Sequence, residues 1–352
     1  MTNCGRFSIN PPRNRTLRKV RRKPQTSIRF IAEVSNCSTA SVSNVINGKG
    51  SVGEETRRRI LENIKKYKYK VNRSARSLRT RTSSTIGIVF SPAIDLFQSE
   101  FYLNVIRGFH KRISREGFDL MLSETAPDSG VPRFVLNGKA DAVAFLNVPV
   151  DAKTVRALRG YETPAVVLDA PSGLFDSVSS DGRSAGAEIF SYLDRAGYRS
   201  FAFFGLARDG ANSETRMAGF VDAAKSRGAD VSAKIYSDEK AVFAEFDKIA
   251  GGARKPLAVF ACNDFLAYPL VRRAAELGFS VPDEIGFFGY GNVSFSSHCS
   301  PTLSSVDVDC AKLGERGAEL LLRRIKNPSV GIVGETLPCA IVPRESVVKF
   351  SV

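Results

Sequence analysis

Residues 35–50 read SNCSTASVSNVINGKG and hold four serines, three asparagines and two valines in sixteen positions. The composition is too polar for a hydrophobic core, yet its apolar residues have a helical spacing. Val42, Val45 and Ile46 occupy positions i, i+3 and i+4 of a helix predicted over residues 39–46. The short polar side chains between them are therefore expected on the outer face of this helix.

Two further helices are predicted around this one. Ser38 is a suitable N-cap for it, because a serine hydroxyl accepts a bond from a free backbone amide. Ser27 caps a preceding helix of about two turns, and Asn36 stands in the turn between the two, where asparagine tolerates a left-handed backbone. A third helix is predicted over about residues 54–67. This arrangement is typical of a helix-turn-helix module, with a generic three-helix bundle as the alternative.

The positive charge of the chain is concentrated around this module. Residues 1–81 contain 21 Lys and Arg against 4 Glu, whereas residues 82–352 contain 30 basic and 32 acidic residues. A basic module on a near-neutral body is typical of a polyanion-binding protein with a second function, and a solubilising tail is the alternative. Residues 1–25 lack an apolar period and are predicted to form a disordered basic arm, which either contacts DNA or is dispensable.

The stretch ASVSNVINGKGSVGEETRRRILENIKKYKYKVNRSARSLRT, residues 40–80, resembles the DNA-binding headpiece and hinge of the lac repressor family. Its most specific parts are Ser-Val-Ser before an asparagine, Glu-Thr-Arg at the start of the third helix, Tyr-x-x-Asn, and Ala-Arg-Ser-Leu. The resemblance continues from Thr26 to Val352. It implies a DNA-binding domain over residues 26–71 and a hinge helix or linker over residues 72–83.

The resemblance also assigns DNA contacts to single residues. In the recognition helix it implies base contacts from Thr39, Ala40 and Asn44. It implies phosphate contacts from Ser38, Ser43, Asn47 and Thr56. In the hinge it implies DNA contacts from Asn72, Ala75 and Leu78. The last two would enter the minor groove, with Leu78 as an apolar wedge that kinks the duplex.

The chain departs from its relatives in this region, so the operator sequence cannot be copied from them. Asn44 replaces a common arginine, and Asn36 and Val71 replace a common glycine and proline. An asparagine side chain pairs with the N6 and N7 atoms of adenine, whereas an arginine reads guanine. We therefore expect Asn44 to read an adenine.

From residue 85 onward, short apolar runs alternate with helical stretches. The runs are TIGIVF (85–90), FDLML (118–122), ADAVAFL (140–146), PAVVLD (164–169), SFAFFG (200–205), LAVFAC (257–262) and EIGFFGY (284–290). This alternation predicts an α/β fold with parallel sheets between helices. The resemblance implies two Rossmann-like lobes, as in periplasmic sugar-binding proteins. The N-lobe would hold about residues 84–179 and 308–338, and the C-lobe about residues 180–307 and 339–352.

Ligands of parallel sheets bind beyond the carboxyl ends of the strands. The loops at those ends contain a carboxylate, amides, a guanidinium and aromatic rings, which together suit a polyhydroxylated ring. The predicted ligand-binding residues are Ser91, Phe101, Tyr102, Arg216, Asn263, Asp264 and Asn292. The resemblance maps effector contacts onto three of them: Arg216, Asn263 and Asp264. An Asn-Asp pair after a strand can equally cap the next helix. A structural role is therefore the alternative to a ligand contact for Asp264.

Gly291 stands where most relatives carry an aspartate that grips the effector. Without that aspartate, a simple neutral sugar is a less certain ligand. A sugar acid or a phosphorylated ligand would lose no favourable contact by its absence.

Several other classes of protein are disfavoured. GFFGYGN lacks the third glycine of a dinucleotide fingerprint, and the chain has no Walker sequence and no Gly-x-Ser-x-Gly elbow, so no catalytic residues are assigned. Six cysteines without a Cys-x-x-Cys pair and two histidines indicate no metal site, and no cofactor is expected. With no secretory signal and no apolar run of about 18 residues, we expect a cytoplasmic protein that does not span a membrane.

The sequence therefore predicts a homodimeric transcriptional repressor that binds a pseudo-palindromic double-stranded DNA operator. A small ligand between the lobes, a sugar or sugar derivative such as a sugar acid, would control its affinity for DNA. A ligand-independent or activating regulator of the same fold is the alternative.

Overall fold

A computed structural model describes residues 27–48, 50–69, 82–92, 95–125, 131–148 and 150–348. The chain forms two compact units, residues 1–80 and 81–352, which we call the headpiece and the body. Within the described ranges, no helix is both long and apolar enough to cross a membrane.

The headpiece contains the three helices that its sequence predicts: α1 (Ile28–Val34), α2 (Thr39–Asn47) and α3 (Glu54–Lys66). The side chains of Ser27 and Ser38 cap α1 and α2 by accepting bonds from the backbone amides of Phe30 and Ser41, both at 3.1 Å. Asn36, in the turn between these helices, has a φ of 46°. The expected left-handed turn at this asparagine is therefore confirmed.

Side chains of α3 fasten the end of α1. Arg59 Nε donates to the carbonyl oxygen of Ser35 at 2.8 Å, and the Asn63 amide donates to that of Val34 at 3.2 Å. The last carbonyls of a helix have no partner within it, so these bonds satisfy groups that would otherwise remain open. Ile31, Val42, Val45 and Ile60 fill the small core beneath them.

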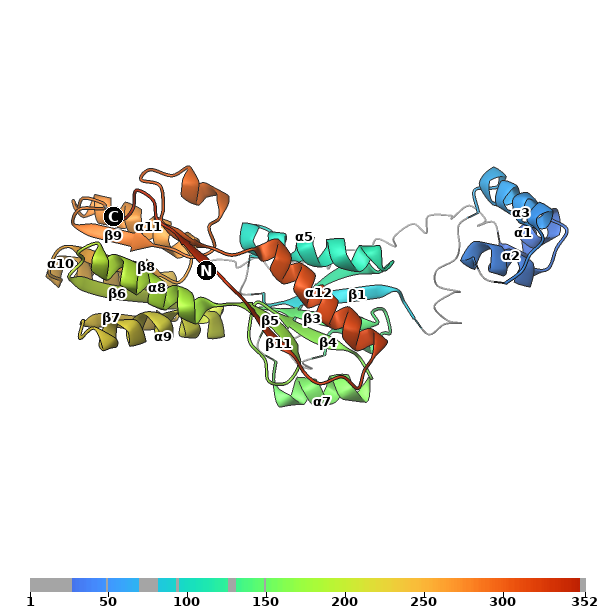
Figure 1. The fold of residues 1–352 in the computed structure, drawn as a ribbon, viewed down its shortest axis with the longest axis horizontal. Helices are drawn as coiled ribbons and strands as arrows, with labels where there is room; N and C mark the ends of the chain where they lie inside the picture. Colours follow the sequence, from blue (N-terminus) through green and yellow to red (C-terminus); the bar gives the residue numbers. More distant parts are fainter. Residues whose placement is uncertain are drawn as a thin grey trace, which may run out of the picture. The chain divides into compact units, whose positions relative to one another are not determined.

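The body is built on two parallel sheets (Figure 1). The first sheet has the strand order β11-β5-β4-β3-β1-β2. Its strands are β1 (Thr85–Phe90), β2 (Asp119–Glu124), β3 (Ala142–Leu146), β4 (Ala165–Leu168), β5 (Asp176–Ser180) and β11 (Gly334–Leu337). Its helices are α5 (Glu100–Arg115), α6 (Arg133–Leu136), α7 (Ala152–Gly160) and α12 (Cys310–Lys326). We call this part the six-stranded lobe.

The second sheet has the order β7-β6-β8-β9, and its strands are also parallel. They are β6 (Ser200–Leu206), β7 (Val231–Tyr236), β8 (Leu257–Ala261) and β9 (Ile285–Phe288). The accompanying helices are α8 (Gly182–Arg195), α9 (Ala211–Ser226), α10 (Glu239–Gly252) and α11 (Asp264–Glu276), with the 3-10 turns η1 (Ala207–Asp209) and η2 (Ser294–Ser297). We call this part the four-stranded lobe. The parallel α/β class expected from the apolar runs is confirmed.

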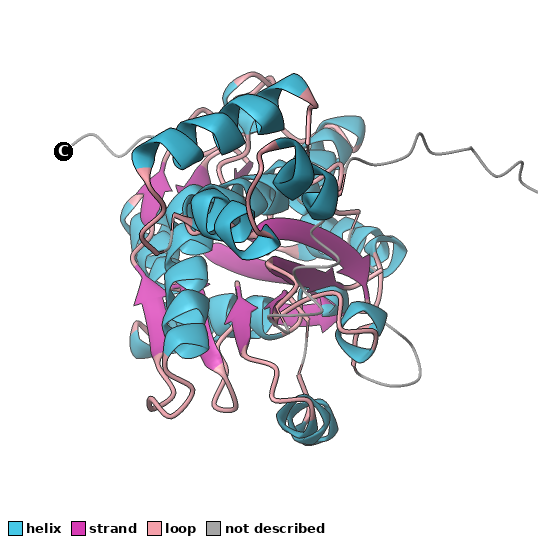
Figure 2. Ribbon diagram, turned by 90° about the vertical axis from the view of Figure 1, so that its right-hand side faces the viewer, coloured by secondary structure: helices cyan, strands magenta, loops and turns pink. Residues whose placement is uncertain are grey.

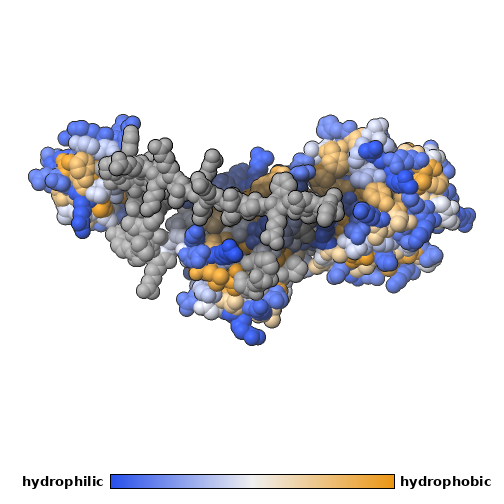
Figure 3. Space-filling view, turned by 180° about the vertical axis from the view of Figure 1, so that it is seen from behind, coloured by the Kyte–Doolittle hydropathy of each residue, from blue (hydrophilic) through white to orange (hydrophobic). Residues whose placement is uncertain are grey.

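The chain passes between the lobes after β5, before α12 and after β11. At the last two crossings, β10 (Ser305–Asp307) pairs antiparallel with β12 (Ala340–Val342). Figure 2 shows the strands of the body in its interior with helices outside. In the face of the body that Figure 3 shows, apolar residues are interspersed among hydrophilic ones.

Five strands have no counterpart among the apolar runs: β5, β7, β10, β11 and β12. The strand β5 reads DSVSS, yet all five residues are buried. Its first residue, Asp176, accepts bonds from the guanidinium groups of Arg323 and Arg324 on α12, the latter at 2.9 Å. A polar strand can be buried when its charges are paired, and local sequence does not reveal such pairing.

Two pairs of helices pack so closely that only glycine fits between them. A Cβ atom at Gly108 of α5 would overlap the carbonyl oxygen of Ala311 in α12, and one at Gly219 of α9 would overlap that of Arg183 in α8. Figure 1 shows α5 and α12 side by side in the six-stranded lobe. Each lobe is therefore stiffened by a tight helix pair.

Gly108→Ala should lower the free energy of unfolding of the body by about 1–3 kcal/mol, because the added methyl group overpacks the contact between α5 and α12. The control is Gly251→Ala, since a Cβ at Gly251 in α10 meets no atom within 4 Å. That change should leave stability unchanged or raise it by up to about 1 kcal/mol. Urea unfolding of both variants measures the difference, and equal stability would contradict the close contact.

Candidate functional site

The outer face of α2 carries short polar side chains. Ser38, Thr39, Ala40 and Asn44 are exposed, while Ser43, Asn47 and Thr56 are half-buried. Val42 and Val45 face the headpiece core, as their spacing predicts. Small exposed side chains let a helix backbone approach a DNA groove closely, and this face offers hydroxyl and amide groups for that purpose.

Two asparagines on α2 are placed differently. The Asn47 amide donates to the carbonyl oxygen of Ser43 at 2.7 Å and lies 3.3 Å from its hydroxyl oxygen. The side chain of Asn44 is exposed and lies beside Gly50, where a Cβ atom would come within 3.0 Å of the Asn44 Nδ2. The amide of Asn44 is therefore the more available of the two. Asn72, Ala75 and Leu78, for which DNA contacts are expected in the hinge, lie outside the described residues.

In the body, a pocket with an empty volume of about 470 Å³ opens between the two lobes. Its lining is Ser99, Phe101, Tyr102, Asp169, Asp209, Asn212, Arg216, Asn263, Phe265, Tyr290 and Val293. We call it the inner chamber. An outer chamber of about 840 Å³ shares five of these residues and adds Asp95, Gln98, Arg208 and Glu239.

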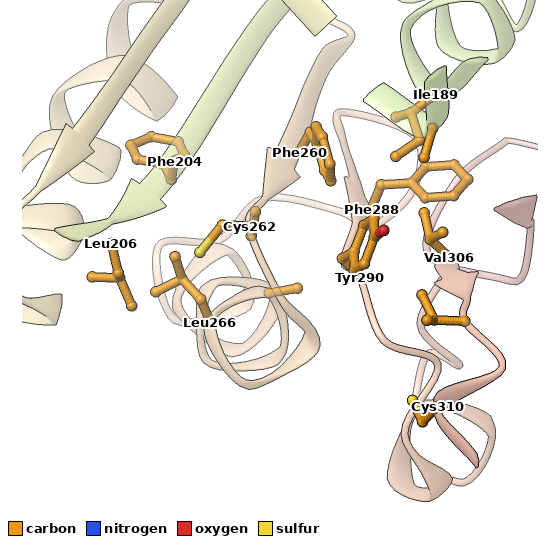
Figure 4. Packing of buried hydrophobic residues seen from close by; sticks show 14 of the residues in the cluster. Ile189, Phe204, Leu206, Phe260, Cys262, Leu266, Phe288, Tyr290, Val306 and Cys310 are labelled. Carbon is orange, nitrogen blue, oxygen red and sulfur yellow. The ribbon is translucent and has the colours of Figure 1, made fainter. Parts of the chain in front are cut away.

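Arg216 on α9 is the buried cation of the inner chamber. Its Nη1 donates to the carbonyl oxygen of Cys262 at 2.6 Å, and its guanidinium carbon lies 3.6 Å from the centroid of the Tyr290 ring. Figure 4 shows Cys262 and Tyr290 on neighbouring segments of the four-stranded lobe. Burial alone would lower the pKa of Arg216, but Tyr290, Asp169 and Asp209 together raise it. Its Nε is buried without a hydrogen-bond partner.

Asp169 is the buried carboxyl group of the same chamber. It follows β4 with a φ of 58°, a left-handed conformation that is unusual for an aspartate. The Asn212 amide donates to its backbone oxygen at 2.7 Å and to its Oδ2 at 3.0 Å, and thereby joins the two lobes. Its Oδ1 is buried without a partner. Burial raises the pKa of Asp169 to about 7, because the opposing effect of Arg216 is incomplete and Asp209 adds to the rise.

The remaining polar groups of the chamber are linked to one another. Asn263 caps α11 through its Oδ1 and donates from Nδ2 to the Oδ2 of Asp209 at 2.9 Å. The Tyr102 hydroxyl accepts a bond from the Asn147 amide at 2.8 Å. Burial, and then the charges of Asp169 and Asp209, raise the pKa of Tyr102 well above its usual value, so it stays neutral.

Four of the seven expected ligand-binding residues line the inner chamber: Phe101, Tyr102, Arg216 and Asn263. The other three do not line either chamber. Ser91 follows β1 and is half-buried. Asn292 donates to Asp307 and accepts from Arg344. Sequence reasoning missed Asp169, Asp209 and Asn212; the strand run PAVVLD ends in Asp169, a signal that could have identified the first of them.

Asp264 lies away from the pocket lining. Its carboxylate is buried and accepts bonds from the Ser305 hydroxyl at 2.6 Å, the Ser296 hydroxyl at 2.9 Å and the backbone amide of Val293 at 3.0 Å. It therefore holds together the loops that follow β9 and precede β10. These contacts agree with the structural role that the sequence analysis gave as the alternative for Asp264. We therefore assign no ligand contact to this residue.

Comparison with known protein families resolves the identity of both units. Residues 27–72 match the model of bacterial regulatory proteins of the lacI family, and residues 190–347 match that of a periplasmic binding protein-like domain. The two matches together span more than half of the chain. The chain combines a LacI-family DNA-binding domain with a periplasmic binding protein-like domain. It is thus a DNA-binding transcriptional regulator.

Individual relatives agree with this assignment along most of the chain. The HTH-type transcriptional repressor PurR of Vibrio vulnificus is 28% identical over 313 residues, which cover 86% of this chain and 92% of that protein. The structure of the lac repressor dimer bound to operator and the anti-inducer ONPF has a TM-score of 0.81 at 20% identity, covering 92% of this chain and all of that one. The structure of a complex of the regulator CelR with cellobiose has a TM-score of 0.67 at 24% identity, covering 91% and 99%.

The position of Asp169 predicts how stability depends on pH. A carboxyl group whose pKa is raised from 3.8 to about 7 stabilises the folded body below pH 4, and this stabilisation is lost as the pH rises through 7. Between pH 5 and pH 8 the loss amounts to about 3 kcal/mol. Asp169→Asn should remove this part of the pH dependence, whereas Asp230→Asn, at an exposed position, should retain it. Thermal or urea unfolding of the unliganded proteins at both pH values measures it, and an unchanged slope in Asp169→Asn would contradict the prediction.

Proposed function

We propose that the protein is a repressor whose affinity for a DNA operator is controlled by a small polar ligand, a sugar or sugar derivative, bound between the two lobes of the body. The observation that carries the proposal is a pocket lined by both lobes, in which a buried acceptor and a buried donor have no partner. A ligand hydroxyl can donate to Asp169 Oδ1 while another oxygen accepts from Arg216 Nε. The cellobiose bound in the similar structure of the regulator CelR supports this class of ligand.

The lobes provide a physical route from ligand to DNA. Phe101, Tyr102 and Asp169 belong to the six-stranded lobe, whereas Asn212 and Arg216 belong to the four-stranded lobe. A ligand that contacts both sets stabilises one relative position of the lobes. The proposed hinge, residues 72–83, leads into β1 of the six-stranded lobe. Ligand binding would therefore change the spacing of the hinges, and the ligand acts only through its different affinity for the two states.

The protein is proposed to act as a homodimer in which two headpieces read a pseudo-palindromic operator, since a twofold dimer presents two equal recognition helices. The lac repressor dimer bound to operator supports this arrangement. A cytoplasmic location is part of the proposal, because the operator would lie on chromosomal DNA. The proposal includes no catalytic step. Two alternatives remain within the same fold. If no ligand changes the affinity for the operator, the protein is a ligand-independent regulator. If a ligand raises transcription through the protein, it is an activator.

Asn44 and Ser43 on α2 separate base reading from anchoring. Asn44→Ala should lose about 1–3 kcal/mol on the cognate operator and tolerate a change of the base pair it reads, because its exposed amide is proposed to contact an adenine. Ser43→Ala should weaken cognate and scrambled DNA alike, since phosphate contacts carry no sequence information. Titrations of each variant against operator, single-base variants and scrambled duplex measure both effects. If Asn44→Ala weakens every duplex by the same factor, Asn44 is not a base reader.

Arg216→Ala should leave operator affinity intact and abolish the response to ligand, because a hydrogen bond from a charged group contributes about 1.5–3 kcal/mol. Arg183→Ala is the control: Arg183 is exposed on α8 and pairs with Asp222 at the surface, so its removal should leave the response unchanged. Operator titrations with and without ligand, after circular dichroism has verified folding, measure the effect. An unchanged dose–response of a folded Arg216→Ala protein would exclude this arginine as a ligand contact.

A further inference from the structure

The two chambers between the lobes carry more negative than positive charge. Four carboxylates line them among the residues that the structure describes: Asp95, Asp169, Asp209 and Glu239. The basic residues in the same lining are Arg208 and Arg216. Arg208 is already paired with Glu239 at 2.7 Å. Among the described lining residues, this leaves the guanidinium of Arg216 to balance Asp169 and Asp209 in the inner chamber, while Asp95 lines the outer chamber.

Helix ends could in principle reverse this balance, because the amino end of a helix carries about half a positive charge. The helices α5, α9 and α11 all begin at the pocket. Each has an acidic residue in its first turn, namely Glu100, Glu214 and Asp264. These residues offset the helix ends with their own negative charge, so the helix ends do not compensate the lining carboxylates.

The carboxylates that face the inner chamber also have free accepting capacity. Asp169 Oδ1 is buried without a donor. Asp209 lines both chambers and uses its Oδ2 for the Asn263 amide at 2.9 Å and the Cys262 thiol at 3.1 Å. Burial is the main cause that raises the pKa of Asp169 to about 7; Arg216 opposes this rise and Asp209 adds to it.

We infer that this pocket excludes anionic ligands and binds a polyhydroxylated amine, such as an amino sugar, more tightly than the corresponding neutral sugar. The ring occupies the inner chamber, with an oxygen toward Arg216 Nε and a hydroxyl toward Asp169. The ammonium group lies at Asp209, where the chambers meet. The inference rests on the proposed function, because it names the class of ligand for the same pocket. It argues against a sugar acid or a phosphorylated ligand.

The charge difference should appear as a large difference in affinity. A unit charge a few ångströms from a partly buried carboxylate interacts strongly enough for about tenfold or more in affinity. We therefore expect the amine to bind about tenfold more tightly than the neutral sugar, and the acid at least tenfold more weakly. The Asp209→Asn protein should lose most of the preference for the amine, while the exposed control Asp230→Asn should keep it.

The first experiment uses matched sugars with the full-length protein. Thermal shift and calorimetric titration compare glucosamine, glucose and glucuronic acid, and then galactosamine, galactose and galacturonic acid. The expected order is amine, neutral sugar, acid in any series that binds. An acid that binds as tightly as its amine would overturn the inference, as would equal affinities for amine and neutral sugar.

The second experiment does not depend on the ligand. Gln98→Cys introduces a thiol into the lining of the outer chamber, and Ser226→Cys introduces one at the exposed end of α9 as control. Peptide mass spectrometry measures the modification rates with 2-aminoethyl and 2-sulfonatoethyl methanethiosulfonate. The ratio of cationic to anionic rate should be several-fold higher at the Gln98→Cys thiol than at the control thiol. It should fall when Asp209→Asn is added.

The two experiments distinguish the failure of each proposal. In one outcome, the ratio of cationic to anionic modification rate is high at the Gln98→Cys thiol, but no sugar binds. This outcome would support the exclusion of anions. It would overturn both the sugar class of the proposed function and the amino sugar as its ligand. In the other outcome, the amine, the neutral sugar and the acid bind equally well, and the ratio of modification rates equals that of the control thiol. This outcome would agree with the proposed sensor function and would overturn the present inference.

Discussion

A buried guanidinium is the constraint on which the pocket depends. A charge taken out of water costs several kcal/mol unless neighbouring groups compensate it. Around Arg216 this compensation comes from the Cys262 carbonyl after β8, the Tyr290 ring after β9, and the carboxylates of Asp169 and Asp209. These groups lie at the carboxyl ends of strands in both sheets. The need to stabilise one cation therefore brings together the polar groups of the binding site.

The same region joins the lobes by few direct bonds. Asn212 donates to Asp169, and the backbone amide of Ser294 donates to the Glu100 carboxylate at 2.7 Å. Each lobe is much stiffer within itself, because α5 and α12, like α8 and α9, meet through glycines that leave no room for a side chain. Under the proposed function, binding energy supplied in the pocket would appear as a change between the lobes, since packed interiors do not deform continuously.

The headpiece follows a different physical rule from the body. Its core is small, and its second helix, α2, keeps short polar residues on the outside. Bonds from Arg59 and Asn63 to the end of α1 supplement this core. Such bonds fix the angle between helices where there is little apolar surface to do so. A rigid frame with an exposed face of hydroxyls and amides suits a surface that must read DNA.

Local sequence by itself determined much of this protein. The three headpiece helices, their serine caps and the left-handed Asn36 follow from spacing and side-chain chemistry within a few residues. The seven apolar runs all became parallel strands, because a run of buried residues between helices has few other stable arrangements. Four pocket residues were also identified, since ligand groups gather after such strands.

Tertiary structure decided the rest. The polar strand β5 is buried because Arg323 and Arg324, far along the chain, pair with Asp176. Asp169 and Asp264 both follow a strand of a parallel sheet. Asp169 faces the pocket, and its Oδ1 has no hydrogen-bond partner. The carboxylate of Asp264 instead accepts hydrogen bonds from Ser296, Ser305 and Val293. A residue type and its place after a strand limit what a side chain can do. Which partners reach it depends on contacts between segments that are distant in sequence, and these contacts form only when the sheets and their connections have packed.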